Sequence, residues 1–359
     1  MGMEKVLTMI KVRIHKTSKK CGDSTELVVM TEGGNVFAGG TADIPLEFIE
    51  PTLEKYYEEL AVLFPEHGKI FPTFEPVGSV GKKARSGDID LAIDLKKLFS
   101  KGVVDADELE SWNIDPQEWQ ATFDKFKKRA RTLSDGQIGW RAFLTEIAKY
   151  INANSDLIQT DLKKIRPGTM FSLFPQFSPD GEQQEEGVQI DWMVGETDWL
   201  RFSYFSDAPS DLEPLVKGLH RTQLLHALFL AKNHSFDHRN GVTNKDTGKR
   251  VAFSPDEAYE VLENLYGKEI AEGDLQNFFT LWDWMSDLVP EDKNLATDRY
   301  LRILDMTNGN KDTVTNERCG YIPQVLEEYW LENYKRIGLK GRYLCKNANP
   351  RLWSTFNES

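Results

Sequence analysis

Polar and apolar residues alternate strictly in two segments of the chain. In residues 88–95 every second position is aliphatic, and three of the positions between carry Asp88, Asp90 and Asp94. In residues 188–194 apolar residues again occupy every second position, and Asp191 projects from the other side. This is the period of a half-buried β-strand. The pattern predicts two strands that each bury one face and present carboxylates on the other.

Apolar residues recur at helical spacing in several other segments. Residues 170–177 instead form a mostly apolar run, which predicts a strand joined to residues 188–194 by a hairpin. The helices expected before this hairpin cover residues 46–64, about 115–133 and about 137–151.

The C-terminal half is predicted to be mostly helical. Ser210 and Glu213 form a capping-box pattern, which predicts a helix to about residue 233. Ser254 opens another helix, and Gly267 closes it. The polar, turn-rich residues 234–251 are expected to be a surface loop. Further helices are expected at residues 274–289 and 321–337.

These elements predict an α+β protein in three parts. Residues 1–45 contain short strands of uncertain role. Residues 46–208 are expected to form a mixed β-sheet with flanking helices, interrupted by a helical insertion at about 105–152. Residues 209–359 are expected to form a mostly helical lobe.

The acidic strand faces are the clearest chemical signal. Asp is depleted in strands, and like charges on one face repel each other, so the arrangement calls for a cation. Magnesium is the obvious candidate. Asp88, Asp90 and Asp191 would supply the carboxylates of a two-metal site, whereas Asp94 is interpreted as structural or solvated.

Gly78 and Ser79 precede the first acidic strand and suit a phosphate. A short helix over residues 80–85 would present its N-terminal N–H groups there, and glycine would let the backbone approach closely. One short unit could therefore hold both triphosphate and metal.

The succession Gly78-Ser79, Asp88-x-Asp90 and a later strand Asp191 resembles the DNA polymerase β-like nucleotidyltransferase superfamily. The resemblance covers about thirty residues, and the wide interval from Asp90 to Asp191 implies an insertion. It implies a nucleotidyltransferase-type sheet and two Mg²⁺ ions, with Mn²⁺ as a substitute, held by the three Asp. By the same resemblance Asp191 would help to activate the acceptor hydroxyl, and Gly78-Ser79 would hold the phosphates of an NTP.

Basic residues near these motifs are candidate nucleotide contacts. Lys82 and Lys83 flank the expected phosphate site. Lys217 and Arg221 lie one turn apart on a predicted helix, where the resembled family often places triphosphate ligands. The basic helix at residues 115–133 is interpreted as a solvated face, with RNA contact as the alternative.

The resemblance predicts an enzyme that transfers a nucleoside monophosphate from an NTP to a hydroxyl without a template and releases pyrophosphate. An RNA 3′ end is the leading acceptor. The alternatives are a synthase of cyclic or short oligonucleotide signals, nucleotidylation of a small molecule or protein, and a catalytically silent nucleotide-binding scaffold.

The amino-acid composition excludes few of these candidate functions. The net charge of −13 argues against nonspecific coating of nucleic acid but leaves room for local basic patches. Three widely separated cysteines show no zinc spacing and no disulfide framework. The chain lacks a signal peptide or an apolar run long enough for a bilayer, so no membrane association and a cytoplasmic location are expected.

Overall fold

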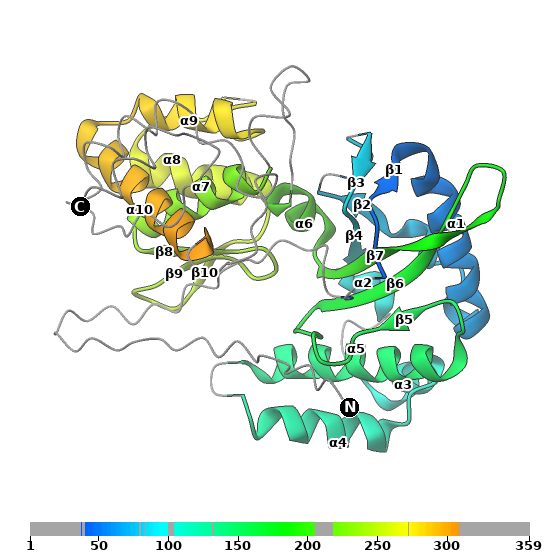
Figure 1. Ribbon diagram of the computed structural model, residues 1–359. Coiled ribbons are helices and arrows are strands. Elements are labelled where there is room, and N and C mark those ends of the chain that lie inside the picture. Colours follow the sequence, from blue (N-terminus) through cyan, green and yellow to red (C-terminus); the bar gives the residue numbers. More distant parts are fainter. Residues whose placement is uncertain are drawn as a thin grey trace, which may run out of the picture.

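The structure is a computed structural model with two lobes (Figure 1). The N-terminal lobe contains the larger β-sheet. The predicted residues Ser79, Lys83 and Lys217, the strands before residue 37, the capping box at 210–213 and the helix at 321–337 lie outside the part described. So does the predicted lobe boundary at 208/209. The described residues are 37, 40–78, 80–82, 84–99, 104–130, 133–204, 218–271 and 273–308.

The N-terminal lobe contains a five-stranded mixed sheet with the order β2-β4-β7-β6-β5. Strands β4 and β7 are parallel, and the other neighbours are antiparallel. The α+β fold class is confirmed, as is the hairpin between β6 and β7. The strands are β2 (Glu75–Val77), β4 (Asp88–Asp94), β5 (Gln159–Thr160), β6 (Thr169–Phe177) and β7 (Gln183–Gly195).

Several helices pack on one face of this sheet, and Leu200 packs on the other. The apolar positions of β4 and β7 belong to the main core cluster, together with residues of α1 (Leu46–Leu63) and α5 (Asp135–Asn154). Figure 1 shows α1 and α5 along this side. The expected helix over residues 46–64 is therefore confirmed, and the carboxylates lie on the opposite face of the sheet.

Helices form in the interval between β4 and β5, and the two longest of them pack on each other. Asp115 and Ser134 cap α4 and α5 by accepting backbone N–H groups, and Pro116 occupies the first position of α4. Both predicted helices are thus confirmed, with α4 ending six residues earlier than expected. The remaining small elements are α2 (Leu95–Leu98), α3 (Ala106–Ser111), α4 (Pro116–Lys127), two 3₁₀ turns (Pro65–His67 and Phe71–Thr73), and the strand pair β1 (Ile44–Pro45) and β3 (Arg85–Ser86).

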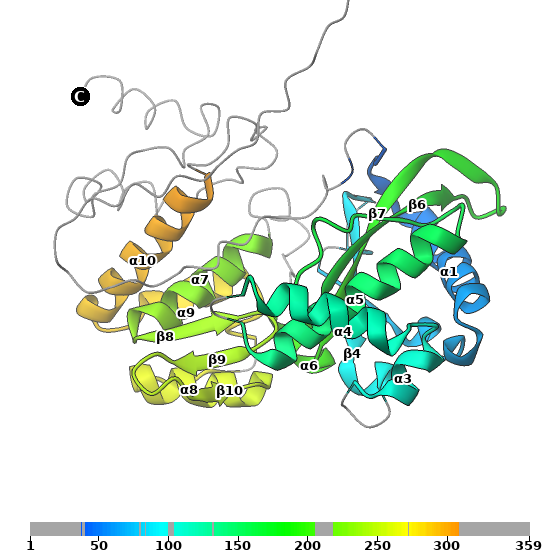
Figure 2. The same cartoon turned by 90° about the horizontal axis from the view of Figure 1, so that it is seen from below.

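The C-terminal lobe has its own core, built from helices and a small antiparallel sheet of order β10-β9-β8. Figure 2 shows the small sheet beside α7 and α8. Gly267 ends α8 in the left-handed conformation, as predicted. The elements are α6 (Thr197–Ser203), which leads into the lobe, α7 (Gly218–Ala231), β8 (His234–Asp237), β9 (Gly241–Asn244), β10 (Arg250–Ala252), α8 (Pro255–Tyr266), α9 (Phe278–Ser286) and α10 (Pro290–Asn308).

The small sheet corrects the expectation of a surface loop at residues 234–251. Phe236 and Val242 face each other across the β8–β9 hairpin and are buried in the lobe core. The side chains of Asp237 and Asn244 accept backbone N–H groups in the adjoining turns, so these polar residues are satisfied locally. Among the described residues, no helix is long and apolar enough to cross a membrane.

Candidate active site

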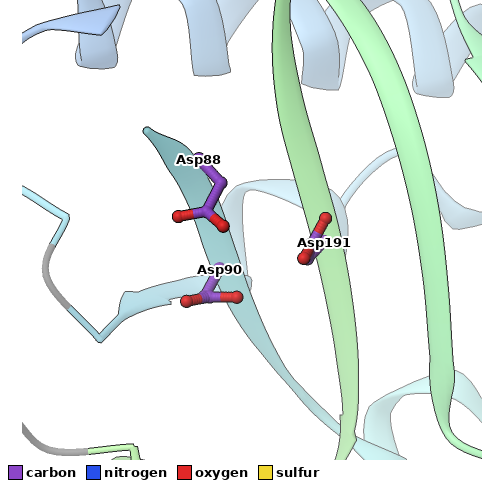
Figure 3. Close-up of side chains that lie close together, drawn as sticks. All are labelled: Asp88, Asp90 and Asp191. Atoms are coloured by element: carbon purple, nitrogen blue, oxygen red, sulfur yellow. The ribbon is translucent and has the colours of Figure 1, made fainter. Parts of the chain in front are cut away.

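Three carboxylates meet on the open face of the sheet (Figure 3). Asp88 and Asp90 are two residues apart on β4, so they share one face. Asp191 on the parallel strand β7 is the register partner of Asp90. Each residue offers a carboxylate oxygen, and these atoms all lie within 4.8 Å of one another. The structure therefore brings together the three predicted acidic residues.

The carboxylates are held in an electrostatically unfavourable arrangement. Asp191 is 1% exposed, whereas Asp88 and Asp90 are half-buried. Burial, and then the nearby charges of Asp90 and Asp88, raise the pKa of Asp191 well above its ordinary value. A divalent cation would relieve this repulsion. The donor set consists of carboxylate oxygens only, which suits hard cations such as Mg²⁺ or Mn²⁺.

Gln189 holds the side chain of Asp191 from the same strand face. Its Nε2 donates to both carboxylate oxygens, at 2.8 and 3.1 Å, and its own side chain is fully buried. Gln189 is also the register partner of Asp88. The sequence reasoning missed this residue, although its position two residues before Asp191 was a usable signal.

Gly78 is pressed against the carboxylate of Asp90. It follows β2, whose last residue, Val77, is the register partner of Asp90. Its φ is +71°, and a Cβ at this position would lie 2.8 Å from Asp90 Oδ2. Glycine is therefore required here for both backbone conformation and space.

The segment after Gly78 corrects one local expectation. The described residues between Gly78 and β3 form turns instead of the expected short helix. Gly81, with a φ of +74°, explains this, because a left-handed residue interrupts a helix. Lys82 lies exposed in the same segment. A phosphate bound here would meet turn N–H groups rather than a helix end.

A small apolar cluster lies on the same face of the sheet as the carboxylates. Its buried members are Val77, Ala92, Met193 and Leu200, and Tyr204 packs against them. Burial raises the pKa of the Tyr204 phenol, and the charges of Asp90 and Asp191 contribute in the same direction. The ring centroid of Tyr204 lies 4.4 Å from that of His238. Sequence reasoning did not single out these two residues.

Arg221, predicted to contact the triphosphate, is buried in the C-terminal lobe. It is 1% exposed and donates hydrogen bonds to the carbonyl oxygens of Phe202 and Leu275, each at 2.6 Å. These bonds tie α6 to the segment before α9. The structure thus gives Arg221 a role in joining elements of the lobe. Phe278 and Trp284 are core residues of the same lobe.

Comparisons with known proteins give only distant matches. No protein family matches the chain, and no curated protein matches it. The solved structures that resemble it include a "Ternary P/T complex" of Leishmania infantum polymerase beta, 13% identical, with a TM-score of 0.32 over 71% of this chain and 77% of that one. A "Ternary gap complex" of the same polymerase is 11% identical, with a TM-score of 0.31 over 70% of each chain. At such low similarity, function has to be inferred from the site itself.

Proposed function

We propose that the protein is a metal-dependent nucleotidyltransferase that moves a nucleoside monophosphate from an NTP to a hydroxyl and releases pyrophosphate. The observation that carries this proposal is the meeting of Asp88, Asp90 and Asp191 on adjacent parallel strands, with oxygens within 4.8 Å. A cluster of half-buried to buried carboxylates is well suited to divalent cations that act in phosphoryl transfer.

Each side chain has a distinct part in the proposed reaction. Asp88 and Asp90 would each hold both cations, and Asp191 would hold the one nearest the acceptor hydroxyl. When bound, two such ions stabilise the charge that develops on the attacking and leaving oxygens of an in-line displacement. Gln189 fixes the orientation of Asp191 through its two hydrogen bonds. Gly78 leaves the space in which the phosphates would approach Asp90.

We further propose that the acceptor is an RNA 3′ end and that no template is used. Ser79, Lys82, Lys83 and Lys217 stay candidate nucleotide contacts on sequence grounds, and Lys82 is exposed in the segment next to Gly78. Arg221 is no longer the favoured contact, because its guanidinium is already bound to backbone carbonyls.

The test is incubation of the purified protein with each α-labelled NTP and Mg²⁺, with and without RNA. The Asp90→Asn variant is the negative control, and Asp94→Asn is the matched control, because Asp94 lies on the same strand but only caps α2. Label in RNA that depends on Asp90 and not on Asp94 is the expected result. Label in a small product without RNA would make the protein a nucleotide-signal synthase instead. Incorporation that is unchanged in Asp90→Asn would refute the metal site.

A further inference from the structure

The fold brings cationic side chains from two distant segments onto one surface. The guanidinium of Arg141, near the start of α5, lies 4.4 Å from the ring centroid of Phe126 near the end of α4. Burial and then the nearby charge of Arg166 lower the pKa of Arg141. Arg141 therefore contacts the end of α4 and lies near Arg166 in the segment that follows β5. We call this the basic surface; it comprises Lys125, Lys128, Arg129, Arg141, Lys163, Lys164 and Arg166.

The basic surface is not neutralised within the part of the chain that the structure describes. Its lysines and Arg129 and Arg166 are exposed, and none of its members forms an ion pair with a described carboxylate. In contrast, the nearby Lys127 and Lys149 each pair with an acidic side chain, Asp135 and Glu146. The chain as a whole carries a net charge of −13. A concentration of unpaired cations on such a protein indicates an anionic partner.

The basic surface is connected to the candidate active site through β6. Arg166 pairs with Thr169 at the start of this strand, and Phe171 is the register partner of Asp191. Residues 166–169 form a turn in which Arg166 and Thr169 exchange backbone hydrogen bonds at 3.0 and 3.1 Å, and Phe171 lies two strand residues further on, about 7 Å beyond Thr169. Pro167, in this turn, accepts a hydrogen bond from Arg239 of the C-terminal lobe. The Arg166 end of the surface therefore lies beside a contact between the lobes and close in the chain to the strand that pairs with Asp191.

We propose that the basic surface binds the phosphate backbone of a single-stranded nucleic acid whose 3′ end lies at Asp191. Cations spread over several turns match a chain of repeated charges better than the compact charge of one NTP. Arg and Lys at such sites bind phosphates and release counterions. This inference rests on the proposed function, and it replaces the interpretation of α4 as a solvated face with the alternative, RNA contact.

The experiment compares two variants with the same change in charge. In the first, Lys163, Lys164 and Arg166 are each changed to Gln; in the control, the exposed Lys55, Lys69 and Lys249 are each changed to Gln. Binding of fluorescein-labelled single-stranded RNA is measured by anisotropy at several salt concentrations, without NTP. Each lost phosphate contact lowers the slope of log K against log salt by about 0.7, so we expect a fall of about 2 in the first variant only.

The outcomes separate this proposal from the proposed function. Equal slopes for the two variants would overturn the basic surface even if the wild-type protein extends RNA. A lower slope in the first variant supports it even if no nucleotide is transferred, and Asp90→Asn should bind RNA with the wild-type slope. A DNA strand of the same sequence distinguishes RNA from DNA as the source of the phosphates. Displacement of RNA by poly-glutamate at equal charge concentration would overturn the assignment to nucleic acid.

Discussion

The two faces of β4 and β7 share one backbone but differ in what they contribute. On the core face, Ile89, Leu91, Ile190 and Trp192 are fully buried against α1 and α5. On the other face, the same strands hold carboxylates that repel one another. Burial of each large apolar side chain contributes about 1.5–3 kcal/mol. The comparison shows how a site that is unfavourable by itself can be kept in place by the packing behind it.

A polar network lies directly behind the carboxylates on the core face. Trp192 Nε1 donates to the hydroxyl of Tyr56 at 2.8 Å, and that hydroxyl is 2.9 Å from Ser172 Oγ. Ser172 in turn donates to the carbonyl of Ile190 at 2.9 Å. Ile190 and Trp192 flank Asp191 in the sequence. The network thus fixes the strand on both sides of the most buried carboxylate.

The largest expected effect is on the carboxylate face. Asp90→Asn should lower nucleotide incorporation by at least about 10³-fold, because metal ions supply several kcal/mol of transition-state stabilisation and each 1.36 kcal/mol is about tenfold. Without metal the same variant should melt at a higher temperature, because one repelling charge is removed. Each kcal/mol relieved should raise the melting temperature by about 2–4 °C. Activity assays and thermal melts in chelator check both parts.

The contribution of Asp191 to the free energy of unfolding should change with pH in the opposite direction from that of an ion-paired carboxylate. The pKa of Asp191 is raised in the folded protein, so its charge opposes folding once the pH exceeds its unfolded value of about 4. In chelator, the free energy of unfolding contributed by this site should therefore fall as the pH rises through the folded pKa. The fall should be smaller in Asp90→Asn. A fall of equal size in both proteins would contradict the predicted repulsion.

A smaller loss is expected when the space beside Asp90 is filled. Gly78→Ala would place a Cβ against Asp90 Oδ2 and displace the carboxylate. A misplacement of about 1 Å can cost about 10²-fold in rate, so incorporation should fall by that order. Gly81→Ala is the matched control, because Gly81 also has a positive φ but has no atom within 4 Å of an added Cβ. Equal losses in the two variants would attribute the effect to backbone strain alone.

The contrast between the faces was visible in the sequence, because strict alternation fixes which side chains share a face. Asp90 and Asp191 could be assigned to one surface on this basis alone. The sequence did not show that they would be register partners, because the pairing of β4 with β7 bridges nearly 100 residues. It likewise could not show the contact of Gly78 with Asp90, which depends on the pairing of β2 with β4.

Local signals failed where tertiary contacts decide the structure. Residues 234–251 are mostly polar, but the burial of Phe236 and Val242 against neighbouring helices turns them into a hairpin sheet. The position of Arg221 on its helix could not show that its guanidinium donates to two backbone carbonyls, and its contact with a nucleotide stays a prediction. The charge pattern along α4 also could not show that Arg166, in another segment of the basic surface, lies near Arg141.

A change on the core face should affect stability more than catalysis. Tyr56→Phe removes the hydroxyl that accepts from Trp192 and meets Ser172. Because it leaves buried polar groups with fewer partners, the free energy of unfolding should fall by about 1–3 kcal/mol. Incorporation should change by less than about tenfold, since the apolar packing of the strand is kept. Denaturant unfolding and the incorporation assay measure the two effects. A large loss of incorporation without a loss of stability would mean that the core face also contributes directly to catalysis.

The smallest effect is expected at Asp94, on the carboxylate face of β4 but at its far end. Asp94 accepts the backbone N–H of Lys96 and caps α2, which confirms its interpretation as structural. Asp94→Ala should lower the free energy of unfolding by about 0.5–2 kcal/mol, the ordinary cost of a lost helix cap. Metal dependence and incorporation should stay at the wild-type level. A loss of activity comparable to that of Asp90→Asn would extend the metal site along the whole strand, whereas unchanged activity confines it to the first three residues of β4 and their neighbour on β7.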